Sequence, residues 1–336
     1  MVSGSARREH ATGVDVIVAG DLGGTNCRLL LAEVQAGQVV VHAEQHYPAR
    51  DFPDFETILE RFVTEQGIES GIASACFAVA GPVRERRVAL TNLPWTLDSE
   101  QLEQRFAIGQ VHLVNDFVAN AYSLATLSET DYHILQTGQV SGGNRVVLGP
   151  GTGLGMALVS VKQGTFTVLP SEGGHMDFAP LDEEQADLLG FLHRDSARVS
   201  YEHILSGPGL VRLYRYYAWR HGVETEPVLQ TDDAPATISR LALTGDDPQA
   251  VLALKLFLRI YGSCAANLAL VGLATGGVYL AGGITTHLIA ALDESDFLAT
   301  FNNKPPMNEL LETMPVRAIT TPRAGLLGAA WYAGNQ

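Results

Sequence analysis

The sequence predicts an α/β protein made of two related lobes. Short apolar strands alternate with amphipathic helices along the chain, which is the pattern of α/β folds. A strand, a glycine-rich turn and a second strand occur at "VIVAGDLGGTNCRLLLAEV" (16–34), and the same order returns at "NRVVLGPGTGLGMALVSV" (144–161). A length of 336 residues is also long for a single hydrophobic core.

The elements of the first half follow from hydrophobic patterning and glycine stops. In the segment 55–67, Ile58, Leu59, Phe62 and Val63 share one helical face ahead of a glycine. The expected elements, in order, are strands at 14–21, 27–34 and 37–48, a helix at 55–67, a buried strand at 73–83, and a strand from 110 that breaks at Asn115-Asp116 into an Ala-rich helix.

The second half is mostly helical after its own strand–turn–strand. The expected elements are helices at 183–195, 205–222, 234–245 and 248–276, strands at 277–284 and 316–321, and a closing helix at 324–334. A repeat at half-chain spacing differs from the short period of a solenoid, so it indicates two similar lobes rather than a repeat array.

Charge and cysteine content narrow the class of protein. The formal net charge of −15 disfavours binding to nucleic acid or to an anionic membrane surface and favours simple solubility. Cys27, Cys76 and Cys264 are odd in number and far apart, so they form neither a disulfide framework nor a metal knuckle. We therefore expect buried, reduced thiols in a cytoplasmic protein.

Two segments bear on targeting. The first 13 residues are polar and lack the apolar core of a signal peptide, so we expect a polar tail at 1–13. No Asp, Glu, Lys or Arg occurs from 260 to 286, a stretch long enough to span a bilayer, but glycines cut it into shorter elements. The sequence thus argues against a membrane-spanning helix in this stretch.

The two glycine turns, "GDLGGTN" and "GPGTGLG", are the candidate phosphate-binding sites. No Gly-Lys dipeptide and no G-x-G-x-x-G occur, which excludes the two familiar nucleotide signatures. Glycines let the backbone approach an oxygen closely, and threonine adds a donor. Since neither turn has a lysine, we expect Mg²⁺ to accompany the nucleotide, with Asp21 as its ligand, through water. Two ordinary hairpins remain the alternative.

Polar side chains at three places are candidate ligand contacts. Asn115 and Asp116 end a strand, where ligand sites of α/β proteins commonly lie, although they could simply cap the following helix. Glu172 and His175 flank two glycines at a polar tip between apolar segments. Glu202 precedes an apolar helical run, where a solvated first-turn acid is the alternative.

Taken in order, "DLGGTN", "GPGTGLG" and "LAGGI" (280–284) resemble the phosphate-1, phosphate-2 and adenosine motifs of the actin-like ATPase and sugar-kinase superfamily. Within it, "VNDFVANAYSL", "LPSEGGHMDFAP" and "YEHILSGPGLVRLY" resemble bacterial glucokinases of the hexokinase type, over nearly the whole chain. The resemblance implies an α/β, two-lobed actin-like ATPase (ribonuclease H-like) fold with an interlobe active-site cleft. It also implies an enzyme that phosphorylates glucose on its 6-hydroxyl with ATP and Mg²⁺, at the entry to glycolysis.

The resemblance also assigns roles to residues. It implies that Asn115, Asp116, Glu172, His175 and Glu202 contact the sugar and that Asp116 is the catalytic base. It implies that the nucleotide is held by Gly20, Asp21, Leu22, Gly23, Gly24, Thr25, Asn26, Gly151, Thr152, Gly153, Gly282 and Gly283. Because the closing strand and helix pack on the first lobe in the family, we expect a small lobe at 14–128 plus 316–336 and a large lobe at 129–315.

This sequence differs from one group of sugar kinases in a zinc-binding feature. Sugar kinases of the ROK group carry a cysteine cluster for structural zinc after a similar Glu…Gly-His loop, and here no cysteine follows His175 in that segment. We therefore expect His175 to contact sugar and no structural zinc to be bound. ATP is the default donor, with ADP or polyphosphate open, and a homodimer is also left open.

Two other function classes are weighed against the kinase. A sugar-sensing transcription regulator would need a DNA-binding module, for which the polar segment before the first strand is too short, and the acidic charge opposes DNA binding. An actin-like ATPase that moves or polymerises would not need the loop from Glu172 to His175. Turnover of ATP with and without glucose separates this last class from a kinase.

Overall fold

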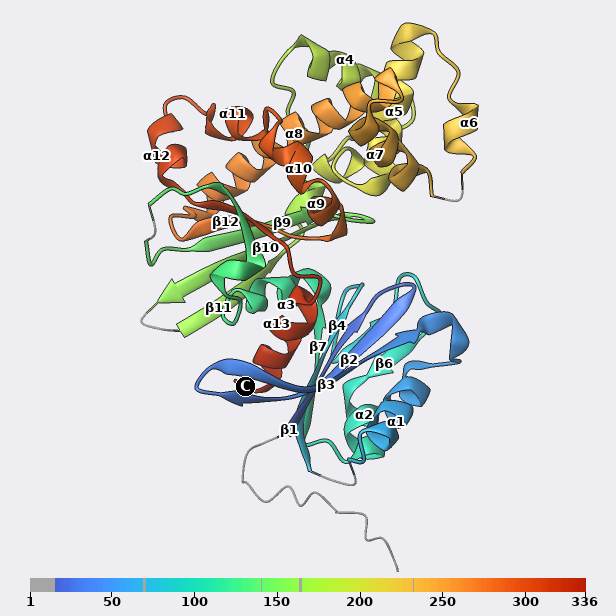
Figure 1. Ribbon diagram of the computed structural model, residues 1–336, viewed down its shortest axis with the longest axis vertical. Coiled ribbons are helices and arrows are strands. Elements are labelled where there is room, and N and C mark those ends of the chain that lie inside the picture. The colour runs from blue at the N-terminus through green and yellow to red at the C-terminus, as the bar shows by residue number, and fades with distance from the viewer. Residues whose placement is uncertain (1–15, 69–70, 140, 163–164, 232) are drawn as a thin grey trace, which may run out of the picture. The chain divides into compact units, whose positions relative to one another are not determined.

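The computed structural model describes residues 16–68, 71–139, 141–162, 165–231 and 233–336 (Figure 1). The chain divides into two compact units, the first made of residues up to Ala119 together with Leu326–Gln336, the second of Asn120–Gly325. The polar tail expected at 1–13 and the expected start of the first lobe at 14 lie outside the described residues.

The first unit is built on a five-stranded sheet. Its strands lie in the order β3-β2-β1-β4-β7, with β2 antiparallel to both β1 and β3, and with β1, β4 and β7 parallel. The strands are β1 (Val16–Leu22), β2 (Asn26–Gln35), β3 (Gln38–Pro48), β4 (Ile72–Val79) and β7 (Gln110–Asn115), beside a small hairpin of β5 (Arg87–Ala89) and β6 (Thr96–Asp98).

Helices cover both faces of this sheet. On one face lie α1 (Phe55–Glu65) and α2 (Ser99–Phe106), and on the other lies the closing helix α13 (Ala324–Ala333) (Figure 1). Asp54 caps α1 by accepting the backbone N–H of Thr57 at 2.8 Å, and the chain leaves the helix at Gly67 with a φ of +65°. The helix predicted at 55–67 is confirmed.

The second unit is built on a six-stranded sheet in the order β11-β10-β9-β12-β13-β8. The strand β9 is antiparallel to β10 and parallel to β12, as β1 is antiparallel to β2 and parallel to β4. The strands are β8 (Tyr132–Gln136), β9 (Arg145–Pro150), β10 (Leu154–Lys162), β11 (Thr165–Ser171), β12 (Gly277–Leu280) and β13 (Val316–Ile319). The repeated strand–turn–strand therefore opens two sheets of the same plan.

This plan corrects the predicted lobe boundaries. The strand predicted at 316–321 was assigned to the first lobe, but β13 pairs with β12 and with β8 in the second sheet. It is the counterpart of β7, the fifth strand of the shared plan, and its backbone N–H and C=O groups find their partners there. Only the segment from Leu326 onward joins the first unit, and the division falls after Ala119 rather than near Ser128.

In the second unit, α5 (Gly207–His221), α7 (Ala234–Thr244), α11 (Phe297–Asn302) and α12 (Asn308–Thr313) pack on α8 (Pro248–Gly272), and the other helices contact neighbouring elements. These other helices are α4 (Glu183–Leu192), α6 (Glu226–Leu229), α9 (Gly283–His287) and α10 (Ile289–Asp293), and α3 (Asp116–Ser123) straddles the division. Within the described residues, α8 is the helix long and apolar enough to cross a membrane, and 72% of its most apolar window is buried inside the structure. Core helices have this character.

The three cysteines behave as expected. Cys27 in β2, Cys76 in β4 and Cys264 in α8 are buried, and all three are free thiols. Burial raises the pKa of each thiol, because a thiolate loses its hydration there. They act as small apolar core residues.

Candidate active site

The first glycine turn joins β1 to β2. Gly23 closes it by donating its backbone N–H to the carbonyl oxygen of Asn26 at 3.0 Å, and Gly24, Thr25 and Asn26 are exposed at its tip. A Cβ on Gly24 would lie 2.7 Å from the Cβ of Asn92, so only glycine fits against this neighbour. The turn offers exposed backbone at the end of a buried strand, the arrangement that suits a phosphate.

Two carboxylates sit at the carboxyl ends of parallel strands in the same unit. Asp21 lies near the end of β1, and Asp116 follows β7 directly, with β4 between the two strands. Carboxyl ends of parallel strands meet at one edge of a sheet, which is where α/β proteins bind ligands. The sheet order thus gathers residues that are far apart in sequence.

Asn115 and Asp116 also start a helix, as the capping alternative predicts. The backbone N–H of Phe117 donates to Oδ1 of Asn115 and to Oδ1 of Asp116, each at 2.9 Å. Capping and ligand binding are compatible, because a capping side chain is held in one orientation at the strand end. The predicted break from strand to helix at this dipeptide is confirmed.

Burial raises the pKa values of both carboxyl groups. Burial raises the pKa of Asp116 to about 6, the Asp21 carboxylate adds to the rise, and hydrogen bonds from Phe117 and Asn115 oppose it. Burial also raises the pKa of Asp21, while the Arg28 guanidinium opposite it on β2 lowers it. Two buried like charges are costly side by side, so this edge of the sheet favours a cation.

A magnesium ion carried by a nucleotide fits this edge. Among the described residues, no three His, Cys, Asp or Glu side chains are grouped to hold a metal by themselves. Mg²⁺ usually keeps several waters and takes only one or two carboxylates together with substrate phosphates. The carboxyl group of Asp21, near the end of β1, matches that smaller requirement.

The second glycine turn joins β9 to β10 and is held at both ends. Gly151 donates its N–H to the carbonyl oxygen of Gly153 at 2.7 Å, and its own carbonyl oxygen accepts the N–H of Gly207 at 2.8 Å. The N–H of Leu154 donates to Oε2 of Glu202 at 2.9 Å. The segment from Glu202 to Gly207 therefore holds the turn by two hydrogen bonds.

Glu202 belongs to a cluster with two other predicted sugar contacts. Nδ1 of His175 lies 3.8 Å from Oε1 of Glu202, and Nε2 of His175 lies 4.0 Å from Oε2 of Glu172. Both separations exceed a hydrogen bond, so they leave room for a ligand hydroxyl to bond with these atoms. The Glu172 side chain is 90% exposed, whereas that of Glu202 is 33% exposed.

The glycines of this loop are required by packing. A Cβ on Gly174 would overlap the carbonyl oxygen of Leu154, and one on Gly173 would lie 2.8 Å from the sulfur of Met156. The short 3₁₀ turn at Gly173–His175 is thus pressed against β10. This contact positions His175 beside Glu202.

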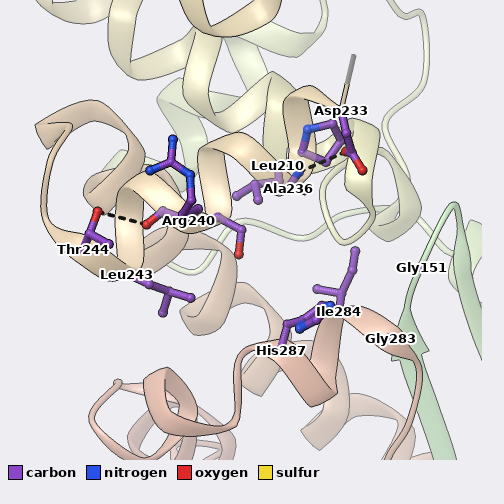
Figure 2. Close-up of a pocket in the computed structure, with 12 residues that line it drawn as sticks. Gly151, Leu210, Asp233, Ala236, Arg240, Leu243, Thr244, Gly283, Ile284 and His287 are labelled. Carbon is purple, nitrogen blue, oxygen red and sulfur yellow. Dashed lines mark hydrogen bonds between the residues drawn. The ribbon is translucent and has the colours of Figure 1, made fainter. Parts of the chain in front are cut away.

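A cavity of about 680 Å³ adjoins the second turn within the same unit (Figure 2). Figure 2 shows side chains of α7, among them Arg240 and Leu243, on one side and Ile284 and His287 of α9 on the other. Its lining is mainly apolar and includes Gly151 and Gly283 from the predicted nucleotide set. A cavity of this size and character suits a flat aromatic base.

Gly282 and Gly283 of the predicted adenosine motif lie between β12 and this cavity. Gly282 has a φ of +90°, and a Cβ there would lie 3.0 Å from the carbonyl oxygen of Pro150. Glycine is therefore needed for α9 to begin close to the second turn.

Some residues of this site were not predicted from the sequence. The sequence did not point to α7, whose apolar face resembles that of any packed helix, nor to Asn92 beside the first turn. It also missed His203, whose pKa is lowered mainly by burial and whose Nδ1 accepts the N–H of Ser200 at 3.2 Å. Thr152 lies in the second turn as predicted, next to Gly151 and Gly153.

The fold and the paired glycine turns define a sugar kinase of the actin-like ATPase type. A glucokinase from an Antarctic psychrotroph matches with a TM-score of 0.86 and 33% identity, covering 96% of this chain and 99% of that one. The glucokinase from Balamuthia mandrillaris, solved in complex with glucose, matches with a TM-score of 0.80 and 25% identity, covering 97% and 95%. A ROK family glucokinase from Streptomyces griseus shares the fold, with a TM-score of 0.63 and 21% identity, covering 96% and 100%.

The chain belongs to the glucokinase family. The family's model matches residues 18–336. The glucokinase of Trichormus variabilis is 39% identical over 340 residues, covering 95% of this chain and 99% of that protein. The predicted fold, family and enzyme class are confirmed.

Proposed function

We propose that this protein transfers the γ-phosphoryl group of MgATP to the 6-hydroxyl of glucose, giving glucose 6-phosphate and ADP. One observation carries the proposal. The Glu202 carboxylate binds the second glycine turn through Leu154 and lies 3.8 Å from His175, so one side chain joins a phosphate-type turn to a polar cluster suited to hydroxyls. A sugar kinase needs these two functions side by side.

The sugar would be held by carboxylate, amide and imidazole groups. We propose that Glu172, His175 and Glu202 bind ring hydroxyls and that Asn115 and Asp116 also contact the sugar. Such groups form directional hydrogen bonds, and a buried polar group left without its partner costs about 1–3 kcal/mol. An epimer that misplaces one hydroxyl should therefore lose roughly tenfold or more in kcat/KM.

Asp116 would be the general base. The sugar hydroxyl is a weak nucleophile until its proton has an acceptor, and a carboxylate with a pKa of about 6 is mostly ionised at neutral pH. Because phosphoryl transfer passes through a loose transition state, Asp116 would mainly orient the hydroxyl and accept its proton late.

The nucleotide would lie along the two glycine turns. We propose that the phosphates bind the backbone of Gly20–Asn26 and of Gly151–Gly153, and that the base enters the cavity beside Gly283. That cavity favours a nucleoside-carrying donor such as ATP over polyphosphate, which has no base to fill it. Bound Mg²⁺ would neutralise phosphate charge, and Asp21 would hold its water shell.

Initial rates test the proposal. The purified protein is assayed with Mg²⁺ over a panel of glucose, mannose, fructose and N-acetylglucosamine, each with ATP, ADP and polyphosphate. We expect the highest kcat/KM for glucose with ATP. Equal values across the sugars, or ATP hydrolysis that ignores glucose, would contradict it.

We also infer that the enzyme acts in the cytoplasm, at the entry of glucose into glycolysis. Three free, buried thiols in this chain support a reducing compartment. Sedimentation of the purified protein tests the homodimer that the sequence left open.

A further inference from the structure

Two separate hydrogen bonds join the second glycine turn to the segment from Glu202 to Gly207. One runs from the side chain of Glu202 to the N–H of Leu154, at 2.9 Å. The other runs from the N–H of Gly207 to the carbonyl oxygen of Gly151, at 2.8 Å. Between these two points, the hydroxyl of Ser206 donates to the carbonyl oxygen of Glu202 at 2.8 Å, which fixes the segment's own shape.

Of the two contacts, only the one made by Glu202 involves a side chain that can leave. The Glu202 side chain is 33% exposed, and its other oxygen, Oε1, faces His175. A Cβ on Gly153 would lie only 2.5 Å from Oε2 of Glu202, so this carboxylate lies directly on the turn. The contact can therefore be altered from the side chain or from the turn.

We infer that Glu202 is a positioning residue that makes nucleotide binding depend on bound glucose. This inference rests on the proposed function. A sugar hydroxyl held between Glu202 and His175 keeps the carboxylate in place, and the carboxylate keeps the turn in its phosphate-binding shape through the N–H of Leu154.

The physical basis is the conformational freedom of the turn. Three of the five residues from Gly151 to Gly155 are glycine, which loses more freedom on ordering than any other residue. Without sugar, the carboxylate is free to turn toward solvent, and binding a phosphate must then also order the turn. When sugar is bound, the turn is already ordered, so phosphate binding no longer has to order it. The two ligands therefore bind with positive coupling. Such coupling limits ATP hydrolysis when no sugar is present.

Calorimetry measures the coupling directly. The probe is a non-hydrolysable ATP analogue with Mg²⁺, titrated into the full chain with and without saturating glucose. For the unsubstituted protein we expect glucose to tighten binding of the analogue by about fivefold or more. The coupling ratio is the Kd of the analogue without glucose divided by its Kd with glucose. For Glu202→Asp, whose carboxylate is too short to reach both Leu154 and the sugar, we expect this ratio to fall below about twofold.

Two further variants complete the test. Glu172→Asp is the matched control, because it makes the same change in the same cluster, and the described approach of the Glu172 side chain is to His175 rather than to the turn. It should weaken glucose binding and keep the unsubstituted ratio. Gly153→Ala displaces the Glu202 carboxylate from the turn's side, so it should lose the ratio while still binding glucose, even if Glu202→Asp fails to fold.

The outcomes separate this inference from the proposed function. If the unsubstituted protein binds no glucose, the proposed function fails. If it binds glucose but the analogue's affinity does not change, or if Glu202→Asp and Gly153→Ala keep the full ratio, the proposed function stands and this inference is overturned. Loss of the ratio in Glu172→Asp as well would also overturn it.

Discussion

Replacing Asp116 by asparagine should slow the enzyme and stabilise it at the same time. The amide keeps the oxygen that accepts the Phe117 N–H but cannot take a proton from the sugar hydroxyl. General-base help is typically worth roughly 10²–10⁴ in rate, so kcat should fall by at least about 100-fold. Glucose affinity should change much less, because the side chain keeps its shape.

The gain in stability follows from the raised pKa of Asp116. A rise from 3.8 to about 6 means that the ionised carboxylate costs the folded state about 3 kcal/mol above pH 6. The native state binds this proton more tightly than the unfolded state, so the cost shrinks as pH falls and is nearly gone below 3.8. Asp116→Asn should thus be more stable by up to about 3 kcal/mol at pH 8, and by less than about 1 kcal/mol at pH 4.

Two measurements check this reasoning. Urea unfolding of both proteins from pH 4 to pH 8 gives the stability difference, and the pH dependence of kcat should show an acid limb near pH 6 in the unsubstituted enzyme. A stability difference that stays constant with pH would refute the buried-charge argument. A variant with full kcat would place the base elsewhere, with Glu172 the next candidate.

Three other substitutions test separate parts of the site. Asp21→Ala should raise the magnesium concentration needed for half-maximal rate while calorimetry shows unchanged glucose binding, and a full rate at low magnesium would make Asp21 only a turn residue. Gly174→Ala, whose Cβ would overlap the Leu154 carbonyl, should cost about 1–3 kcal/mol in stability and raise the KM for glucose, so normal thermal unfolding and kinetics would contradict the packing argument. Ile284→Ala should raise the KM for ATP roughly fivefold or more without changing the KM for glucose, since it removes about 1–2 kcal/mol of apolar contact from the cavity, and an unchanged KM for ATP would mean that the base binds elsewhere.

Local features of the fold were predictable from sequence. The glycine turns, the strands on either side of them and the break at Asn115-Asp116 are encoded by neighbouring residues, and the structure has them where the patterns put them. Helices α5, α7 and α8 were also expected, because each has a long apolar pattern and a clear stop.

Features that depend on distant pairing were not predictable. The strand β13 looks the same in sequence whichever sheet it joins, and its partners β12 and β8 decide the matter. Glu202 reads as an ordinary first-turn acid, because the Leu154 N–H that it binds lies 48 residues away. The cavity beside Gly151 likewise forms only when α7 and α9 come together.

The return of α13 to the first unit affects the order in which the chain folds during synthesis. In this helix, Trp331 donates its indole N–H to the Gly37 carbonyl oxygen at 3.1 Å, and the Tyr332 ring meets His112 edge-on with centroids 5.1 Å apart. The second unit is continuous in sequence and emerges from the ribosome between the two parts of the first.

At about 5–20 residues per second, the intervening segment takes roughly 10–40 s to translate. For that time the β-sheet made first lacks the helix α13 that covers one of its faces. The unit that is synthesised first is therefore the one whose folding is completed last.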